Sequence, residues 1–492
     1  MDFLIDGSVG AAGLAVLAFG LLCALGFEFA NGFHDTANAV ATVIYTHSLK
    51  PVQAVIWSGC WNFVGVLTSS GAVAFGIVAL LPAELIVQAG SPASLAMIFA
   101  LLASAILWNV GTWYLGLPAS SSHTLIGSII GVGLMNAITA GDGWIDGVNW
   151  DKLRSTMLAL LISPVVGFVA SALLLLLARR FLRNPVLHQP PEEQAPPPFS
   201  IRALLIATCT GVSFAHGSND GQKGIGLIML VLISLAPAAF ALQLSTSPER
   251  LSEIVEASRF VAPMLAKAPV PGPIDNDIAE THLEHYVDLG RPDAWTLPSL
   301  AVKNDNIRKM LTGITSLRDL SPEQRTQLRR DIYLIDEAAD EMVKSNIIGD
   351  DVAAAIDTLS DKLIPLTEFI PVWVKVAVAL ALGLGTMIGW KRIVVTIGEK
   401  IGKGRLTYAQ GATAELVTMS TISLADVVGL PVSTTHILSS GVAGAMFAGH
   451  SGLQSQTVRN ILLAWVLTVP ATMLLGSALF AASLYMFLRL LG

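Results

Sequence analysis

Two short polar motifs lie inside otherwise apolar stretches and hold the residues best suited to bind ions. Asn31-Gly32-Phe33-His34-Asp35 resembles His216-Gly217-Ser218-Asn219-Asp220, with an offset of 185 residues. A charged side chain at membrane depth costs about 2.5–3.5 kcal/mol on insertion scales and usually has a functional reason. We therefore expect the two aspartates to bind or exchange a coupling cation, although a polar contact between helices is the plainer alternative.

Further polar residues accompany these aspartates. Gly32 and Gly217 are expected to break their helices and free backbone groups for ion binding. Glu28 lies seven residues before Asp35, which places both near one helix face. The candidates for cation or proton coupling, besides the two aspartates, are His34, Asn31, Asn38, Asn219, Glu28 and Glu415, with Lys223 in a supporting role.

A second matched pair is rich in hydroxyl groups. The segment Gly116–His123 resembles Gly429–His436, with an offset of 313 residues. Pro118 and Pro431 suit the first turn of a helix, so the hydroxyls would sit at a helix N-terminus, where free amides and the dipole favour an anion. Ordinary helix capping is the alternative. The predicted anion-binding residues are Ser120, Ser121, Ser122, Thr124, Ser433, Thr434 and Thr435, and the supporting residues His123 and His436 would orient the hydroxyls, titrate or pack.

The composition indicates that these motifs are carried by membrane helices. Of the 492 residues, 53% are hydrophobic and 13% are charged, whereas soluble domains have about 25% charged residues. Apolar runs near or above the ~20 residues needed to cross a bilayer recur at 11–30, 52–81, 158–178 and 372–389. The three cysteines form no CxxC pair, so we expect no disulfide and no metal site.

The two motif pairs define an internal repeat. Their offsets differ by 128 residues, and an acidic segment of 124 residues, 245–368, separates the two motifs of the second half. That segment has 22 acidic and 13 basic residues, a net charge of −9, whereas the rest has 14 acidic and 16 basic residues, a net charge of +2. The halves therefore match once the segment is removed.

Charge placement predicts opposite orientations for the two halves. Basic residues favour the cytoplasmic side of a span, and they gather in the proline-rich linker 179–199 and in 391–405. The prediction is an all-α integral membrane protein of two inverted repeats with broken helices or helical hairpins. Its expected parts are a first repeat, 1–178; the cytoplasmic linker, 179–199; a second repeat in two pieces, 200–244 and 369–492; and a periplasmic insert, 245–368.

The insert is expected to be a small soluble helical domain. Its best helix is Ser321 to Lys344, with Ser321 as N-cap and Glu323 in the first turn. No basic patch indicates a nucleic-acid partner.

The four motifs together resemble the PiT family of inorganic phosphate transporters. The resemblance covers both halves, about 360 residues, and is greatest to the bacterial low-affinity, proton-coupled branch, which also has a long insert in the second half. It implies a multi-pass protein of the inner (plasma) membrane, with phosphate at the Ser/Thr motifs and the coupling cation near the aspartates. Sodium-coupled members tend to have Asn before the first aspartate, where this chain has His34.

We therefore expect symport of phosphate with protons, without a cofactor, by alternating access. Transport of phosphate as a divalent metal complex and assembly as a homodimer are both left open. The alternatives are sodium coupling, or sulfate or another tetrahedral oxyanion on the same fold. A membrane-embedded hydrolase is disfavoured, because Ser122 and His123 are adjacent in sequence, a poor arrangement for a nucleophile and its base.

Overall fold

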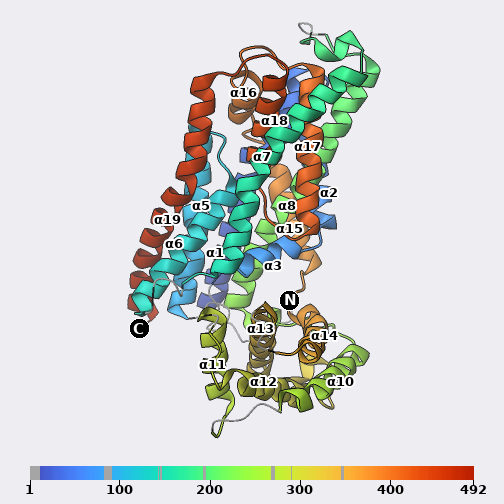
Figure 1. The fold of residues 1–492 in the computed structure, drawn as a ribbon. Helices are drawn as coiled ribbons and strands as arrows, with labels where there is room; N and C mark the ends of the chain where they lie inside the picture. The colour runs from blue at the N-terminus through green and yellow to red at the C-terminus, as the bar shows by residue number, and fades with distance from the viewer. Residues whose placement is uncertain are drawn as a thin grey trace. The chain divides into compact units, whose positions relative to one another are not determined.

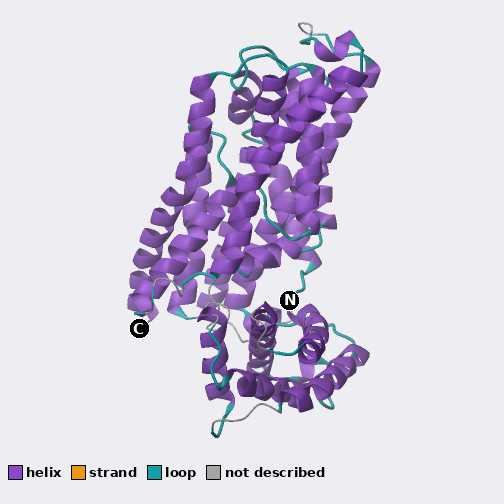
Figure 2. Cartoon of the chain, viewed as in Figure 1, coloured by secondary structure: helices purple, strands orange, loops and turns teal. Residues whose placement is uncertain are grey.

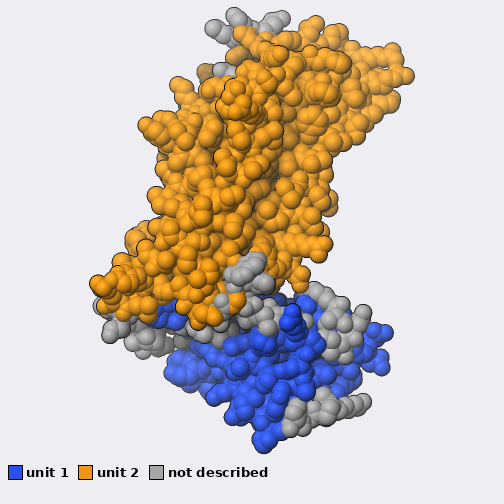
Figure 3. Space-filling model, turned by 60° about the vertical axis from the view of Figure 1, so that its left-hand side comes forward, with its two compact units in different colours: residues 1–18, 82–94, 229–370 blue, residues 19–81, 95–228, 371–492 orange. Residues whose placement is uncertain are grey.

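The computed structural model describes residues 11–81, 91–141, 143, 147–191, 195–266, 272–289, 291–344 and 348–491, without the side chains of 11–12, 36–38, 238, 288–289, 344, 397, 399 and 490–491. Its regular structure is helical (Figure 2), with one isolated β-bridge between Gly402 and Leu453 among these residues. The chain forms two compact units (Figure 3): one of residues 1–18, 82–94 and 229–370, and one of residues 19–81, 95–228 and 371–492.

Long apolar helices confirm the predicted membrane class. Among the described residues, six helices are long and apolar enough to cross a bilayer, and two bent helix pairs raise the number to eight. The six are α1 (Ala11–Tyr45), α5 (Pro92–Tyr114), α6 (Ser121–Ala140), α7 (Trp150–Phe181), α8 (Phe199–Leu235) and α19 (Ser455–Leu491).

Shorter helices complete the larger unit. One bent pair lies within it, α2 (Pro51–Thr68) and α3 (Ala72–Val78), with an angle of 75° between them. The others are α15 (Val372–Met387), α16 (Lys391–Glu399), α17 (Tyr408–Val427), α18 (Thr434–Ala448) and the 3₁₀ turn η2 (Pro185–His188).

The helices that follow the two hydroxyl motifs pack reciprocally on the final helices of the two halves (Figure 1). Helix α6, from the first half, packs along α19 of the second, and α18 of the second packs along α7 of the first. Glycines permit the close approach: a Cβ on Gly131 would lie 2.7 Å from Met473 Cα, and one on Gly444 would lie 2.9 Å from Phe168 Cα. Small residues at such crossings are typical of membrane helices.

The prediction that Gly32 and Gly217 break their helices is wrong. Helices α1 and α8 run through both positions without interruption. A Cβ on Gly32 would lie 2.9 Å from the Thr386 amide nitrogen, and one on Gly217 would lie 2.7 Å from Asn62 Cα. These glycines let α1 pack against α15 and α8 against α2, and the break occurs instead at Gly71, with φ 100°, between α2 and α3.

The two proline motifs begin their helices later than predicted. Helix α6 starts at Ser121 and α18 at Thr434, so Pro118 and Pro431 precede the N-caps instead of occupying the first turn. In both copies a glycine with positive φ ends the preceding helix: Gly116 has φ 67° and Gly429 has φ 69°. Their left-handed conformation is the usual C-terminal cap, and each proline disfavours a helical conformation of the residue before it, Leu117 or Leu430.

The smaller unit contains five longer helices from the insert. They are α10 (Pro248–Leu265), α11 (Asn276–Leu289), α12 (Thr296–Leu311), α13 (Pro322–Lys344) and α14 (Asp350–Thr367); α9 (Pro237–Phe240) and the 3₁₀ turn η3 (Leu317–Asp319) are short. Ser321 accepts a 3.3 Å hydrogen bond from the Gln324 amide, which confirms it as the N-cap of α13. Buried Lys303 joins three helices, because its Nζ lies 2.8 Å from Glu280 Oε2 and 2.9 Å from Asp331 Oδ1.

Candidate anion and cation site

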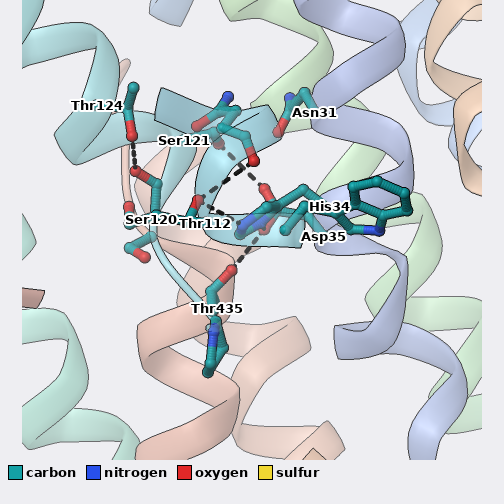
Figure 4. Close-up of polar contacts among 12 residues, drawn as sticks. Asn31, His34, Asp35, Thr112, Ser120, Ser121, Thr124 and Thr435 are labelled. Atoms are coloured by element: carbon teal, nitrogen blue, oxygen red, sulfur yellow. Dashed lines mark hydrogen bonds and ion pairs between the residues drawn. The ribbon is translucent and has the colours of Figure 1, made fainter. Parts of the chain in front are cut away.

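Asp35 is the point where the two hydroxyl motifs meet (Figure 4). Ser121, the first residue of α6, donates a 3.0 Å hydrogen bond to Asp35 Oδ2, and Thr435, the second residue of α18, donates a 2.5 Å bond to Oδ1. All three side chains are buried. Two helix N-termini from different halves of the sequence therefore converge on one carboxylate in the C-terminal third of α1.

The His34 side chain stands between this carboxylate and α5. Its Nδ1 lies 3.4 Å from Asp35 Oδ1, and its Nε2 lies 3.3 Å from the Thr112 hydroxyl. Thr112 also donates to the Trp108 carbonyl oxygen, which fixes its hydroxyl on α5. The predicted pairing of His34 with Asp35 is thus present as a contact between their side chains.

Asp220 lies beside the same cluster and is held by a buried lysine. Lys223 Nζ is 2.8 Å from Asp220 Oδ1 and 3.5 Å from Ser121 Oγ. The ammonium group therefore reaches from the aspartate of the second half to a hydroxyl of the first.

His216 joins the two aspartates, a role that the sequence analysis did not assign. Its Nε2 lies 3.4 Å from Asp220 Oδ2 and 4.0 Å from Asp35 Oδ2, while its Nδ1 lies 2.9 Å from Asn62 Oδ1. The available signal was its spacing, because a residue four positions before Asp220 shares its helix face.

The two halves exchange histidine and asparagine between matching positions. His216 matches Asn31, and Asn219 matches His34. Asn31 donates a 3.3 Å hydrogen bond to Glu28 Oε1, and Asn219 donates a 3.2 Å hydrogen bond to the Leu430 carbonyl oxygen. The repeat is therefore asymmetric in its chemistry: both imidazoles lie beside Asp35, and both amides bond elsewhere.

The remaining motif hydroxyls fix the two helix starts. Ser120 accepts from the His123 amide at 3.2 Å, and Ser433 accepts from the His436 amide at 3.1 Å, so both are N-caps. Thr434 is the buried first residue of α18. Ser122 donates to the Val432 carbonyl oxygen and Thr124 to the Ser120 carbonyl oxygen.

The two motif histidines pack against each other. The rings of His123 and His436 are 4.4 Å apart, and the His436 ring stacks on Trp465 at 3.9 Å. His123 Nδ1 also lies 2.9 Å from Ser120 Oγ. Since Ser122 bonds to a backbone oxygen and His123 faces Ser120, the structure shows no Ser122–His123 hydrogen bond of the kind that a hydrolase would need.

Other predicted coupling residues make contacts outside the Asp35 cluster. Buried Glu415 on α17 accepts a hydrogen bond from Thr208 on α8. Glu28 is buried and packs against Gly224 on α8. The Asn38 side chain lies outside the described residues.

Asp426, an acid within an apolar stretch and so a candidate for ion coupling like Glu28 and Glu415, forms a further polar anchor. It accepts bonds from Ser218 at 2.6 Å and from Gln222 at 2.5 Å. These contacts tie α8 to the end of α17, beside the second hydroxyl motif.

The cluster offers ligands for a cation as well as donors for an anion. One ligand atom each from Asp35, His216 and Asp220 lies within 4.8 Å of the others. Carboxylates and imidazoles bind metal ions or exchange protons. A cation at these side chains would lie next to the hydroxyls of Ser121 and Thr435.

The chain is similar to known phosphate transporters. A family model described as the phosphate transporter family matches residues 31–476. The low-affinity inorganic phosphate transporter PitA of Escherichia coli (strain K12) is 42% identical over 506 residues, covering 98% of each chain. A low-affinity inorganic phosphate transporter of Buchnera aphidicola subsp. Acyrthosiphon pisum is 43% identical over 477 residues, covering 95% of this chain and 96% of the relative.

A solved structure supports the fold. It is titled "The sodium-dependent phosphate transporter", has a TM-score of 0.52 at 20% identity, and is matched over 95% of this chain and 98% of its own. The family match spans most of the chain and includes both motif pairs, so this chain belongs to the phosphate transporter family.

Proposed function

We propose that this protein imports inorganic phosphate across the inner membrane by symport with protons. The bacterial relatives are named as low-affinity inorganic phosphate transporters. The observation that carries the proposal is the convergence of Ser121 and Thr435 on Asp35, because it brings two helix N-termini to one buried point.

That point has the properties of an oxyanion site. Helix N-termini supply free amides and a partial positive charge, and buried hydroxyls add hydrogen-bond donors. Buried Lys223 adds a full positive charge 3.5 Å from Ser121 Oγ. A tetrahedral oxyanion placed here would accept bonds from both helices at once.

Phosphate must compete with Asp35 for these hydroxyls. Ser121 and Thr435 each point their hydroxyl at the carboxylate, and a hydroxyl has one proton to donate. Two anions side by side in a buried site would repel strongly. A proton shared between the carboxylate and a phosphate oxygen removes this repulsion, so the anion and the proton would enter together.

A proton suits the site better than sodium does. Lys223 already places an ammonium group 2.8 Å from Asp220, where a sodium ion would otherwise bind. Two imidazoles, from His34 and His216, flank Asp35, and imidazole is a side chain that commonly takes up and releases protons in proteins. Sodium coupling remains the second candidate, favoured by the grouping of Asp35, His216 and Asp220.

The carboxylate also favours phosphate over sulfate. At neutral pH inorganic phosphate carries at least one hydroxyl that can donate to Asp35, whereas sulfate has only acceptor oxygens. A site built to accept such a donor rejects an analogue that lacks it, because the buried acceptor would be left unpaired.

Alternating access fits the way the helices are arranged. The reciprocal packing of α6 on α19 and of α18 on α7 is expected for two halves of inverted topology. Glu28 and Glu415 are proposed as further proton carriers on α1 and α17, since both are buried acids within apolar helices. We further propose that phosphate crosses the membrane as a complex with a divalent metal ion.

The test is phosphate accumulation in proteoliposomes under separately imposed gradients. In sodium-free buffer, an inward proton gradient should drive uptake that a protonophore abolishes, and Asp35→Asn and Asp220→Asn should each lose at least about tenfold. His47→Asn serves as control, because His47 is exposed and its φ of 56° suits asparagine.

Three outcomes would contradict parts of the proposal. Uptake that requires sodium and ignores the protonophore would establish the sodium-coupled mode. Sulfate that competes as well as unlabelled phosphate would remove the selectivity argument. Uptake that is unchanged when magnesium is removed would exclude a metal–phosphate complex as the substrate.

A further inference from the structure

A basic cavity of about 620 Å³ lies between the end of α5 and the start of α16. Its walls combine aromatic and cationic side chains, and those used below are Trp113, Tyr114, Lys391, Arg392 and Lys400. The backbone of Gly116, where the first hydroxyl motif begins, also lines it. The cavity belongs to the larger unit alone.

Its charge is uncompensated among the described side chains. Lys391, Arg392 and Lys400 form no ion pair there, and Arg392 Nη1 donates a 2.6 Å hydrogen bond to the uncharged Tyr114 carbonyl oxygen. The N-cap of α16 is Trp390, which provides no side-chain hydrogen bond, so the first amides of this helix are left for another acceptor. Three cations and an uncapped helix N-terminus around one cavity indicate an anionic ligand.

The rim of this cavity carries exposed apolar side chains of the kind that contact lipid acyl chains. Exposed fractions are 70% for Leu115, 65% for Tyr114 and 56% for Ile388, all beside the basic residues. Aromatic and basic side chains next to exposed aliphatic ones are typical of the membrane–water interface. A ligand with a charged head and apolar tails would contact both parts of this surface.

We propose that this cavity binds the phosphate headgroup of an anionic phospholipid. The headgroup would lie against Lys391, Lys400 and the start of α16, and its acyl chains would follow the exposed aliphatic residues. This site is separate from the Asp35 cluster and does not depend on how phosphate transport is coupled.

The cavity wall is joined to the transport site by short contacts. The Arg392 guanidinium lies 5.2 Å from the Trp113 ring centre, and the Trp113 ring lies 4.9 Å from that of Phe33. Phe33 precedes His34 in sequence, and Thr112, which bonds to His34, precedes Trp113. A bound headgroup would therefore hold in place the residues on both sides of the His34–Thr112 contact.

The binding test uses the full-length protein in detergent, titrated with defined lipids and followed by native mass spectrometry. We expect phosphatidylglycerol to bind at least tenfold more tightly than phosphatidylcholine. Each basic residue near an anionic lipid contributes about fivefold, so Lys391→Gln/Lys400→Gln should weaken phosphatidylglycerol binding about 25-fold. The matched control is Lys152→Gln/Arg154→Gln, two exposed basic residues at the start of α7, which should change binding less than twofold.

The same titration can overturn the proposal. Equal affinity for both lipids, or equal losses in the two double variants, would show that the cavity is not the site. Displacement of phosphatidylglycerol by inorganic phosphate or tripolyphosphate at matched concentration would identify a soluble anion as the ligand instead. A melting temperature measured for each variant separates lost binding from lost folding, and the single variant Lys400→Gln should still show about a fivefold loss.

Discussion

At the scale of single residues, one carboxylate organises the site. Asp35 contacts Ser121 and Thr435, which are 86 and 400 residues away in sequence. Its second imidazole neighbour, His216, comes from α8 and reaches Asp220 as well. Most of the other motif residues support this cluster through caps and backbone hydrogen bonds.

His216 should be as important for transport as the aspartates. His216→Gln removes the titratable ring between Asp35 and Asp220, so we expect gradient-driven phosphate uptake to fall at least about tenfold. Uptake should be measured in proteoliposomes beside His450→Asn, an exposed histidine with φ 58°. Uptake near the wild-type rate would show that the bridge between the aspartates has no role.

The stability of the insert is predicted to depend on pH through one residue, Asp336. Burial, helped by the neighbouring acids Asp340, Glu337 and Glu368, raises the pKa of Asp336 from 3.8 to about 7, despite a hydrogen bond with Ser360. Because folding then favours the protonated form, this group's contribution to stability is present below pH 4 and is lost as the pH rises toward 7.

Asp336→Asn should therefore stabilise the insert at pH 8 and leave it nearly unchanged at pH 4. Hydrogen exchange of α13 in the full chain, measured across this range, gives the local opening free energy. Burial opposes ionisation of Glu280, but Lys303 outweighs it and lowers the pKa of this carboxyl. The pH-dependent stability that Glu280 contributes has the opposite sign, and because it is the same in wild type and variant, it cancels in the comparison. A difference between variant and wild type that does not change with pH would contradict the assignment.

At the scale of helices, glycines decide how closely α1 and α8 approach their neighbours. Gly217→Ala would place a Cβ 2.7 Å from Asn62 Cα, and the overpacking should cost about 1–3 kcal/mol. Gly26→Ala on α1 is the matched control, because nothing lies within 4 Å of its Cβ and alanine is the better helix former.

Thermal unfolding in detergent compares the two alanine variants. Gly217→Ala should lower the melting temperature, and Gly26→Ala should keep or raise it. Equal melting temperatures would mean that α8 and α2 do not pack as closely as described. The same measurement on Gly32→Ala examines the corresponding contact of α1 with α15.

At the scale of the whole molecule, the insert is predicted to lie on the non-cytoplasmic face. The basic stretch 391–405 follows one span later and favours the inside. Glu323→Cys, at an exposed position in the first turn of α13, should therefore react with a membrane-impermeant maleimide in intact cells. The background should contain Cys60→Ser, because Cys60 is exposed.

Arg183→Cys tests the predicted cytoplasmic face of the same topology. Arg183 is an exposed residue of the linker after α7, which is predicted to be cytoplasmic. It should react only after lysis. Labelling of Arg183→Cys alone in intact cells would reverse the orientation, and labelling of both cysteines would show that the insert and the linker do not lie on opposite sides.

The sequence by itself determined the membrane class, the motif pairs and the residue types of the site. Hydrophobic content and span length are local properties, so the apolar runs 11–30 and 158–178 fall in the long helices α1 and α7, whereas 52–81 and 372–389 fall in bent helix pairs. Ser120 and Ser433 cap their helices as hydroxyls at such positions do, because capping depends on residues three apart.

Only the tertiary structure decided which residues meet. Whether Gly32 and Gly217 break a helix or admit a neighbouring backbone depends on what packs there, and the neighbours, Thr386 and Asn62, are distant in sequence. The positions of Pro118 and Pro431 before the caps follow from the turns at Gly116 and Gly429. The bridge through His216 depends on α1 and α8 lying side by side at the level of the two aspartates, a relation that no local pattern contains.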